Sequence, residues 1–111
     1  MCNEPSPIAC DLTAIDPEQR EHHQALSPTL IASADERLEL PDGFAWRHPN
    51  TTERLMELAV FISNERLCCP FYNFVLEIEP EGGPIWLRLT GRAGVKEALA
   101  AGLLELNLLN D

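Results

Sequence analysis

The chain has 111 residues, of which 45% are hydrophobic and 23% are charged, and its formal net charge at pH 7 is −10. Length and composition are those of a single globular domain with a modest hydrophobic core. The charge argues against binding of duplex DNA or RNA, because phosphate contacts need clustered Lys and Arg and the eight basic residues are scattered along the chain. Binding to an anionic membrane surface is disfavoured for the same reason.

The start of the sequence, residues 1–20, contains no basic residues followed by an apolar run, so it does not read as a secretory signal. No stretch reaches the roughly 18 apolar residues that a membrane-spanning helix needs. A cytoplasmic location is therefore expected. In a reducing compartment the four cysteines are expected as free thiols or metal ligands rather than as disulfides.

Residues 1–15 contain two prolines and show no hydrophobic period, which predicts an extended N-terminal arm ahead of a single α+β domain over residues 16–111. A helix is predicted to start after Asp16, which can cap it, because a proline suited to the first helical position follows. This helix should run to about Leu26. The Ser-Pro pair that ends at Pro28 then either kinks it or starts a second short turn.

A β-hairpin is predicted over about residues 36–48. Polar and apolar residues alternate on its first strand, and Phe44, Trp46 and His48 share one face of its second strand. The connecting turn ends in Gly43, which is expected to supply a positive φ.

The next predicted helix begins at Asn50 as its N-cap and ends before Pro70, since proline pushes the preceding residue out of the helical region. Its apolar residues recur at helical spacing and predict a buried stripe. The members of this stripe are Leu55, Leu58, Ala59, Ile62 and Cys69, with Phe61 and Cys68 packing beside them.

A second hairpin, over about residues 72–89, is predicted from alternating apolar residues on both sides of a Gly- and Pro-rich turn at residues 80–84. A final helix follows Gly91. Two hairpins, each followed by a helix, predict a two-layer sandwich in which a four-stranded antiparallel sheet carries helices on one face, plus the N-terminal helix. The other sheet face, with Trp86, Arg88 and either Tyr72 or Trp46, is a candidate surface for a homodimer.

The adjacent cysteines Cys68 and Cys69 are the main chemical feature of the sequence. Core packing alone can explain them, because free cysteine is among the most buried residue types. A disulfide between neighbours is disfavoured, since their Cα atoms lie only ~3.8 Å apart whereas bridged cysteines need ~4.4–6.8 Å. Their position at a helix C-terminus also disfavours an activated thiolate, so catalysis is the weaker interpretation.

Metal binding suits this helix end better, because the macrodipole favours a cation there and thiols are soft ligands. The pair is nevertheless not the Cys-x-x-Cys knuckle of a zinc site, so a ligand from elsewhere is needed, with Cys10 as the first candidate. Zinc, Cu(I) or a thiophilic toxic ion such as As(III) or Hg(II) fits three thiolates. The candidate additional ligands are His22, His23 and Glu65.

The chain resembles a group of small bacterial proteins that share an E-R-x-C-C-P-F motif and a downstream W-L-x-x-x-G-x-x-G-V-K pattern, over about residues 10–105. The segments that carry the resemblance are Glu65–Phe71, Trp86-Leu87 with Gly91–Lys96, Leu40–Phe44 and Cys10–Leu12. The resemblance implies that Cys10, Cys68 and Cys69 belong together, whereas Cys2 has no counterpart in the pattern. It implies no ligand.

Three functional hypotheses follow. The first is a cytoplasmic homodimer that binds a soft metal ion through Cys10, Cys68 and Cys69. The second is a protein-interaction or homodimerisation module whose cysteines are only core residues. The third is a thiol-dependent enzyme or redox protein, which would need an activating neighbour that the sequence does not reveal.

Overall fold

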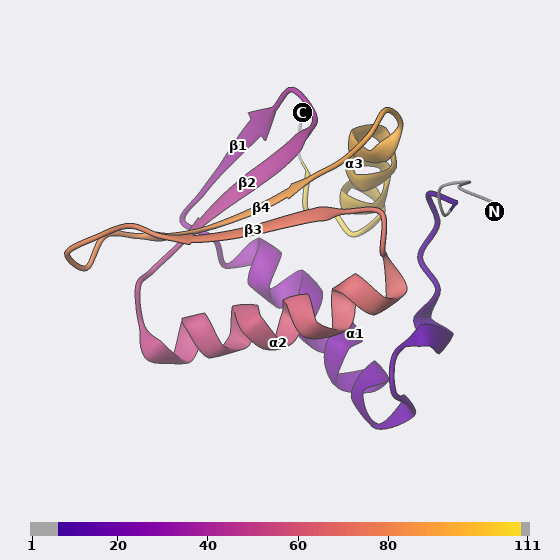
Figure 1. The fold of residues 1–111 in the computed structure, drawn as a ribbon, viewed down its shortest axis with the longest axis horizontal. Coiled ribbons are helices and arrows are strands. Elements are labelled where there is room, and N and C mark those ends of the chain that lie inside the picture. Colours follow the sequence, from indigo (N-terminus) through magenta and orange to yellow (C-terminus); the bar gives the residue numbers. More distant parts are fainter. Residues whose placement is uncertain (1–6, 110–111) are drawn as a thin grey trace, which may run out of the picture.

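The computed structural model describes residues 7–109, which form three α-helices, one 3-10 turn and a four-stranded antiparallel sheet (Figure 1). In chain order the elements are η1 (Leu12–Ala14), α1 (Pro17–Ala32), β1 (Glu36–Leu40), β2 (Gly43–His48), α2 (Thr52–Cys68), β3 (Asn73–Ile78), β4 (Ile85–Thr90) and α3 (Val95–Glu105). The strand order is β1-β2-β4-β3. The predicted α+β class, with two hairpins each followed by a helix and an additional N-terminal helix, is confirmed.

The helices pack on the core side of the sheet: α1 crosses and contacts α2, and α3 stands apart from them and contacts β2 (Figure 1). Strand pairing aligns the apolar side chains of the core across the sheet. Trp46 on β2 lies opposite Leu87 on β4, and Leu87 lies opposite Leu76 on β3. Leu58 of α2 packs against these side chains and is fully buried. Phe44, Trp46 and His48 do share a face, as predicted, and that face is the core.

The opposite face of the sheet is more polar than the sequence suggested. Trp86 and Arg88 lie on it, whereas Trp46 and Tyr72 belong to the core side. Arg88 Nη2 lies 2.7 Å from Glu77 Oε1 in an ion pair across the two strands of the second hairpin. Any contact surface here would therefore combine one aromatic side chain with paired charges.

Several predicted element boundaries need correction. Helix α1 does not end near Leu26 but continues through Pro28 to Ala32. The N-cap of α2 is Thr51, whose hydroxyl accepts the Arg54 N–H, and it replaces the predicted Asn50.

Gly43 has no positive φ; its role is steric, because a Cβ there would overlap the carbonyl of Leu89 on the neighbouring strand. The buried stripe of α2 is also shifted. Phe61 and Cys68 are buried members of it, whereas Ala59 is exposed.

Within residues 7–109, no helix combines the length and the apolar character that crossing a membrane requires.

The buried His48 side chain makes a pH-dependent contribution to stability. Arg54 Nη1 donates to His48 Nδ1 at 2.7 Å, and burial together with the Arg54 charge lowers the pKa of His48 to about 4, against the weaker effects of Asp35 and Glu57. Between about pH 4 and 6.5, His48 therefore binds a proton in the unfolded chain but not in the folded chain.

We expect the free energy of unfolding to fall by up to about 1.4 kcal/mol per pH unit as the pH drops from 6.5 towards 4. Urea unfolding across this range measures it. The slope should shrink in His48→Gln and persist in His22→Gln, which removes an exposed histidine; equal slopes in both variants would contradict the assignment.

Candidate functional site

The end of α2 places two cysteines in the protein interior. The helix ends at Cys68 because Cys69, the residue before Pro70, takes the extended φ of −128°. The Cys69 N–H still donates to the Glu65 carbonyl at 2.7 Å, so the chain turns without losing this bond. The side chains of Cys68 and Cys69 are 2% and 1% exposed.

The N-terminal segment runs along this helix end and is anchored to it. The Asp11 N–H donates to the Cys68 carbonyl at 2.8 Å. Ile15 is buried in a small cluster with Cys68, Cys69, Phe71 and Val95. Residues 7–15 of the predicted arm are therefore attached to the domain and include a 3-10 turn, whereas residues 1–6 of that arm, with Cys2, lie outside the described part of the chain.

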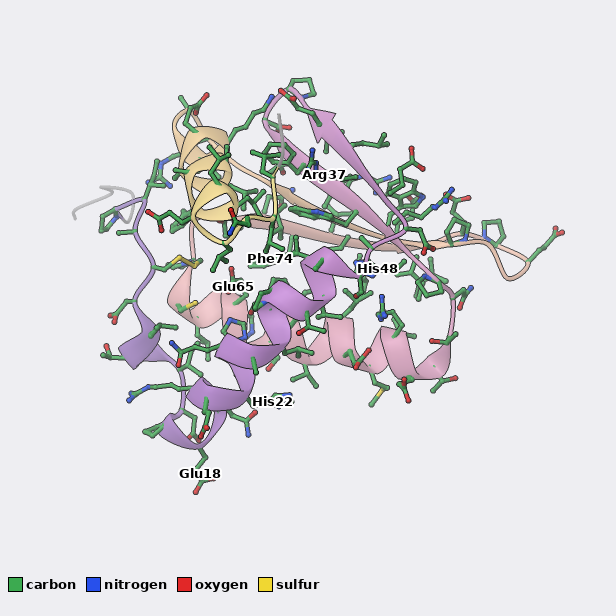
Figure 2. The ribbon with its side chains drawn as sticks, turned by 180° about the vertical axis from the view of Figure 1, so that it is seen from behind. Glu18, His22, Arg37, His48, Glu65 and Phe74 are labelled. Atoms are coloured by element: carbon green, nitrogen blue, oxygen red, sulfur yellow. A yellow bond between two sulfur atoms is a disulfide. The ribbon has the colours of Figure 1, made fainter. Side chains whose placement is uncertain are left out.

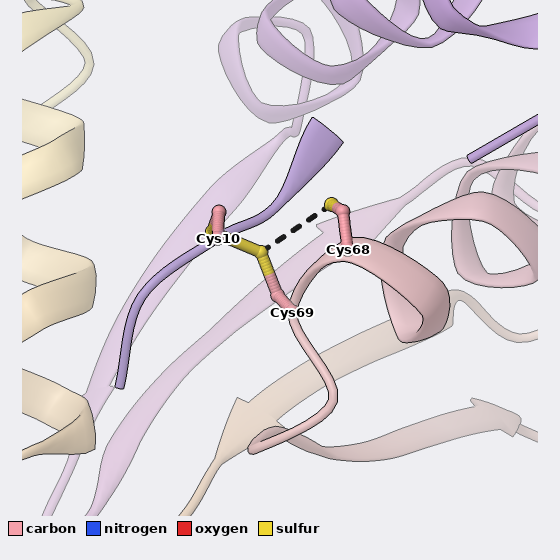
Figure 3. A group of neighbouring side chains, drawn as sticks. All are labelled: Cys10, Cys68 and Cys69. Atoms are coloured by element: carbon pink, nitrogen blue, oxygen red, sulfur yellow. Dashed lines mark hydrogen bonds between the residues drawn. A yellow bond between two sulfur atoms is a disulfide. The ribbon is translucent and has the colours of Figure 1, made fainter. Parts of the chain in front are cut away.

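Cys10 and Cys69 form a disulfide (Figure 3), with Cα atoms 4.7 Å apart and a sequence separation of 59. This disulfide corrects the expectation that the cysteines are free thiols. That expectation rested on the expected reducing compartment, and the sequence gives no distance between two residues as far apart along the chain as Cys10 and Cys69. The predicted absence of a Cys68–Cys69 disulfide is confirmed, because Cys68 keeps a free thiol.

The free thiol lies against the disulfide. Cys68 Sγ is 3.5 Å from Cys69 Sγ, the contact drawn as a dashed line in Figure 3. The sulfur atoms of Cys10, Cys68 and Cys69 all lie within 4.8 Å of one another. The fold thus brings Cys10, Cys68 and Cys69 together, in a geometry that could hold a metal ion as well as form a disulfide.

The environment of Cys68 keeps its thiol protonated. Burial raises the pKa of Cys68 to about 12, and the carboxylate of Glu65, whose Oε1 accepts from Cys68 Sγ at 3.5 Å, adds to the shift. A thiol with this pKa is almost entirely neutral near pH 7 and is a poor nucleophile. The structure therefore gives Cys68 none of the activation that the enzyme hypothesis needs.

A second group of potential ligands shares Cys68 with the first. His23 Nε2 lies 2.7 Å from Glu65 Oε1, and ligand atoms of His23, Glu65 and Cys68 lie within 4.8 Å of one another. His23 is 3% exposed and its ring stacks on Phe61 at 5.7 Å between centroids. Among the described residues, its Nδ1 has no hydrogen-bond partner. The thiol of Cys68 is thus bordered by sulfur on one side and by a carboxylate-histidine pair on the other.

His22 is the one predicted ligand that the fold leaves out. It is exposed on α1 and belongs to neither group of candidate ligands in the described chain. In Figure 2 it lies well apart from Glu65. Adjacent helical residues point ~100° apart, so the inward position of its neighbour His23 requires this outcome.

Sequence reasoning did not identify Ser27 as part of this site. Its hydroxyl lies 3.3 Å from His23 Nε2 and donates to the His23 carbonyl at 2.8 Å. The contact could have been predicted, since Ser27 follows His23 by four positions and residues with this spacing share a helix face.

Neither family models, curated proteins nor solved structures give a match to this chain. The geometry of the site is therefore the basis for assigning a function.

Proposed function

We propose that the reduced chain binds one soft metal or metalloid ion through Cys10, Cys68 and Cys69. The observation that carries this proposal is the mutual proximity of the three sulfur atoms, all within 4.8 Å. Thiolates prefer zinc, Cu(I) and thiophilic ions such as As(III) or Hg(II). The C-terminus of α2, where Cys68 is the last helical residue, adds a partial negative charge that stabilises a cation.

Glu65 and His23 suit supporting roles in such a site. A tetrahedral zinc ion needs a fourth ligand, and a carboxylate oxygen of Glu65 is already next to Cys68. His23, paired with that carboxylate at 2.7 Å, would orient it, as outer residues do around bound metals. A three-coordinate ion would need only the sulfurs.

Reduction must precede binding, because the Cys10–Cys69 bond occupies two of the three ligand atoms. Two electrons and two protons convert this disulfide into two thiols. Binding then releases protons, so affinity should rise with pH, most of all because the pKa of Cys68 is raised.

Cadmium titration of the fully reduced chain tests the proposal through the ultraviolet absorbance of cadmium-thiolate bonds. We expect one ion per chain, with affinity lowered tenfold or more in each of Cys10→Ser, Cys68→Ser and Cys69→Ser because each removes one of three ligands. Cys2→Ser, outside the proposed site, should bind normally. Unchanged affinity in all three site variants, or no thiolate absorbance at all, would refute the proposal.

A redox role is the second candidate, and the disulfide beside a third thiol favours it. In this reaction an external dithiol would reduce Cys10–Cys69 to two thiols and would itself become a disulfide. The protonated state of Cys68 argues that the attacking thiolate comes from the partner molecule. Rapid reduction by a dithiol without any metal uptake would favour this role over metal binding.

A protein-interaction or homodimerisation module is the third proposal. It predicts a homodimer in the cytoplasm. The polar sheet face that carries Trp86 and the Arg88–Glu77 pair is its candidate surface. Sedimentation velocity of the purified chain tests the dimer.

A further inference from the structure

An apolar pocket of about 220 Å³ opens next to the cysteine cluster. Side chains of α1, α2 and α3 line it together with β4, and its buried apolar members are Phe61, Leu89, Leu99 and Leu103. Cys10, Ser27 and Glu65 also line it, so one part of its wall belongs to the site described above.

Gly102 is an exposed residue in the wall of this pocket. It lies inside α3, where glycine costs about 1 kcal/mol of helix stability relative to alanine. A Cβ at this position would meet no heavy atom within 4 Å, so no close packing requires the missing side chain. A larger residue here would project into free space beside the pocket wall that Gly102 helps to form.

We propose that this pocket holds the carbon substituent of an organometallic ligand whose metal atom is bound by the cysteines, with mono-aryl arsenic(III) compounds as the class. This inference rests on the proposed metal-binding function and extends it to the ligand. A bare ion would be held by the sulfur atoms and would leave the adjoining apolar pocket unused. A cavity of about 150 Å³ lined by Leu, Ile and Phe suffices to bind benzene, so the present volume accommodates a phenyl ring.

The binding step needs only two of the three cysteines. An aryl-arsenic dihydroxide reacts with the thiols of reduced Cys10 and Cys69; two As–S bonds form, two As–O bonds break, and two water molecules leave with the thiol protons. Arsenic stays in the trivalent state throughout. Since Cys10 lines the pocket, the remaining As–C bond can direct the ring towards Phe61 and Leu99. Cys68 forms no bond to arsenic in this step.

Phenylarsine oxide and methylarsine oxide make a matched pair of probes, because both form two As–S bonds and differ only in the carbon group. Each is competed against dithiothreitol for the reduced Cys2→Ser chain. We expect the chain to prefer phenyl over methyl by at least tenfold more than dithiothreitol does. Gly102→Phe, which adds a phenyl ring at the pocket wall, should abolish this excess, and Gly102→Ala should retain most of it.

Three outcomes are decisive. A phenyl preference equal to that of dithiothreitol, or one that survives in folded Gly102→Phe, overturns this inference while leaving metal binding intact if arsenite and cadmium still bind. Failure of arsenite, cadmium and both organic probes overturns the proposed function as well. If Gly102→Phe does not fold, NMR contacts between phenyl protons and the methyls of Leu99 and Leu103 in the original chain decide the question, and their absence refutes the inference.

Discussion

Reduction of the Cys10–Cys69 disulfide is expected to lower the free energy of unfolding by about 4 kcal/mol. The bond joins residues 59 positions apart, so it closes a loop that covers more than half of the chain. Opening this loop gives the unfolded chain more conformations and so favours unfolding. For a domain whose total stability is typically about 5–15 kcal/mol, this loss is large.

Urea unfolding with and without a phosphine reductant measures this difference directly. Cys10→Ser should unfold at the same urea concentration in both conditions, because it has no bond to reduce. Cys68→Ser and Cys2→Ser should keep the full response. A response to reductant below about 1 kcal/mol in the unaltered chain would mean that the loop is already constrained in the unfolded state.

The second large effect concerns the reactivity of Cys68. In the oxidised Cys2→Ser chain Cys68 is the remaining thiol, and we expect iodoacetamide to alkylate it at pH 8 about a thousandfold more slowly than free cysteine. Only the thiolate reacts, and burial with the nearby Glu65 raises the pKa of Cys68 to about 12, compared with about 8.5 for free cysteine. Mass spectrometry of timed samples gives the rate.

The pH dependence separates the raised pKa from simple shielding. Up to about pH 11 the rate should rise tenfold per pH unit, because the thiolate fraction does so below the pKa. Glu65→Gln should speed the reaction by removing a neighbouring negative charge, and Glu18→Gln, an exposed carboxylate on α1, should not. A rate at pH 8 within tenfold of free cysteine would contradict the raised pKa.

The fold was largely predictable because the residues that mark its turns and strand faces act locally in the sequence. Turn residues mark both hairpins, and the alternation of Phe44, Trp46 and His48 sets which side of the strand faces the core. The end of α1 was not predictable in this way. Pro28 lacks an N–H for the helix, but burial of Leu30 against the core stabilises the last turns despite that loss.

In the candidate site, too, contacts between residues close in sequence were predictable and contacts between distant residues were not. Cys68 and Glu65 are three positions apart on one helix, so their proximity follows from helical spacing. The partnership of Cys10 with Cys69 depends on how residues 7–15 pack on the end of α2, which no local pattern encodes. The pocket beside Gly102 likewise exists only when three helices are assembled.

The disulfide also determines how the chain carries mechanical load. When the two ends of the oxidised molecule are pulled, tension enters at Cys10 and leaves at Cys69 through the sulfur bridge. The intervening segment holds α1, the first hairpin and α2, and it stays slack. Roughly 200 Å of contour length is thereby withheld from extension. Only the reduced molecule can be drawn out to its full length, so the Cys10–Cys69 bond makes the chain shorter and stiffer under force.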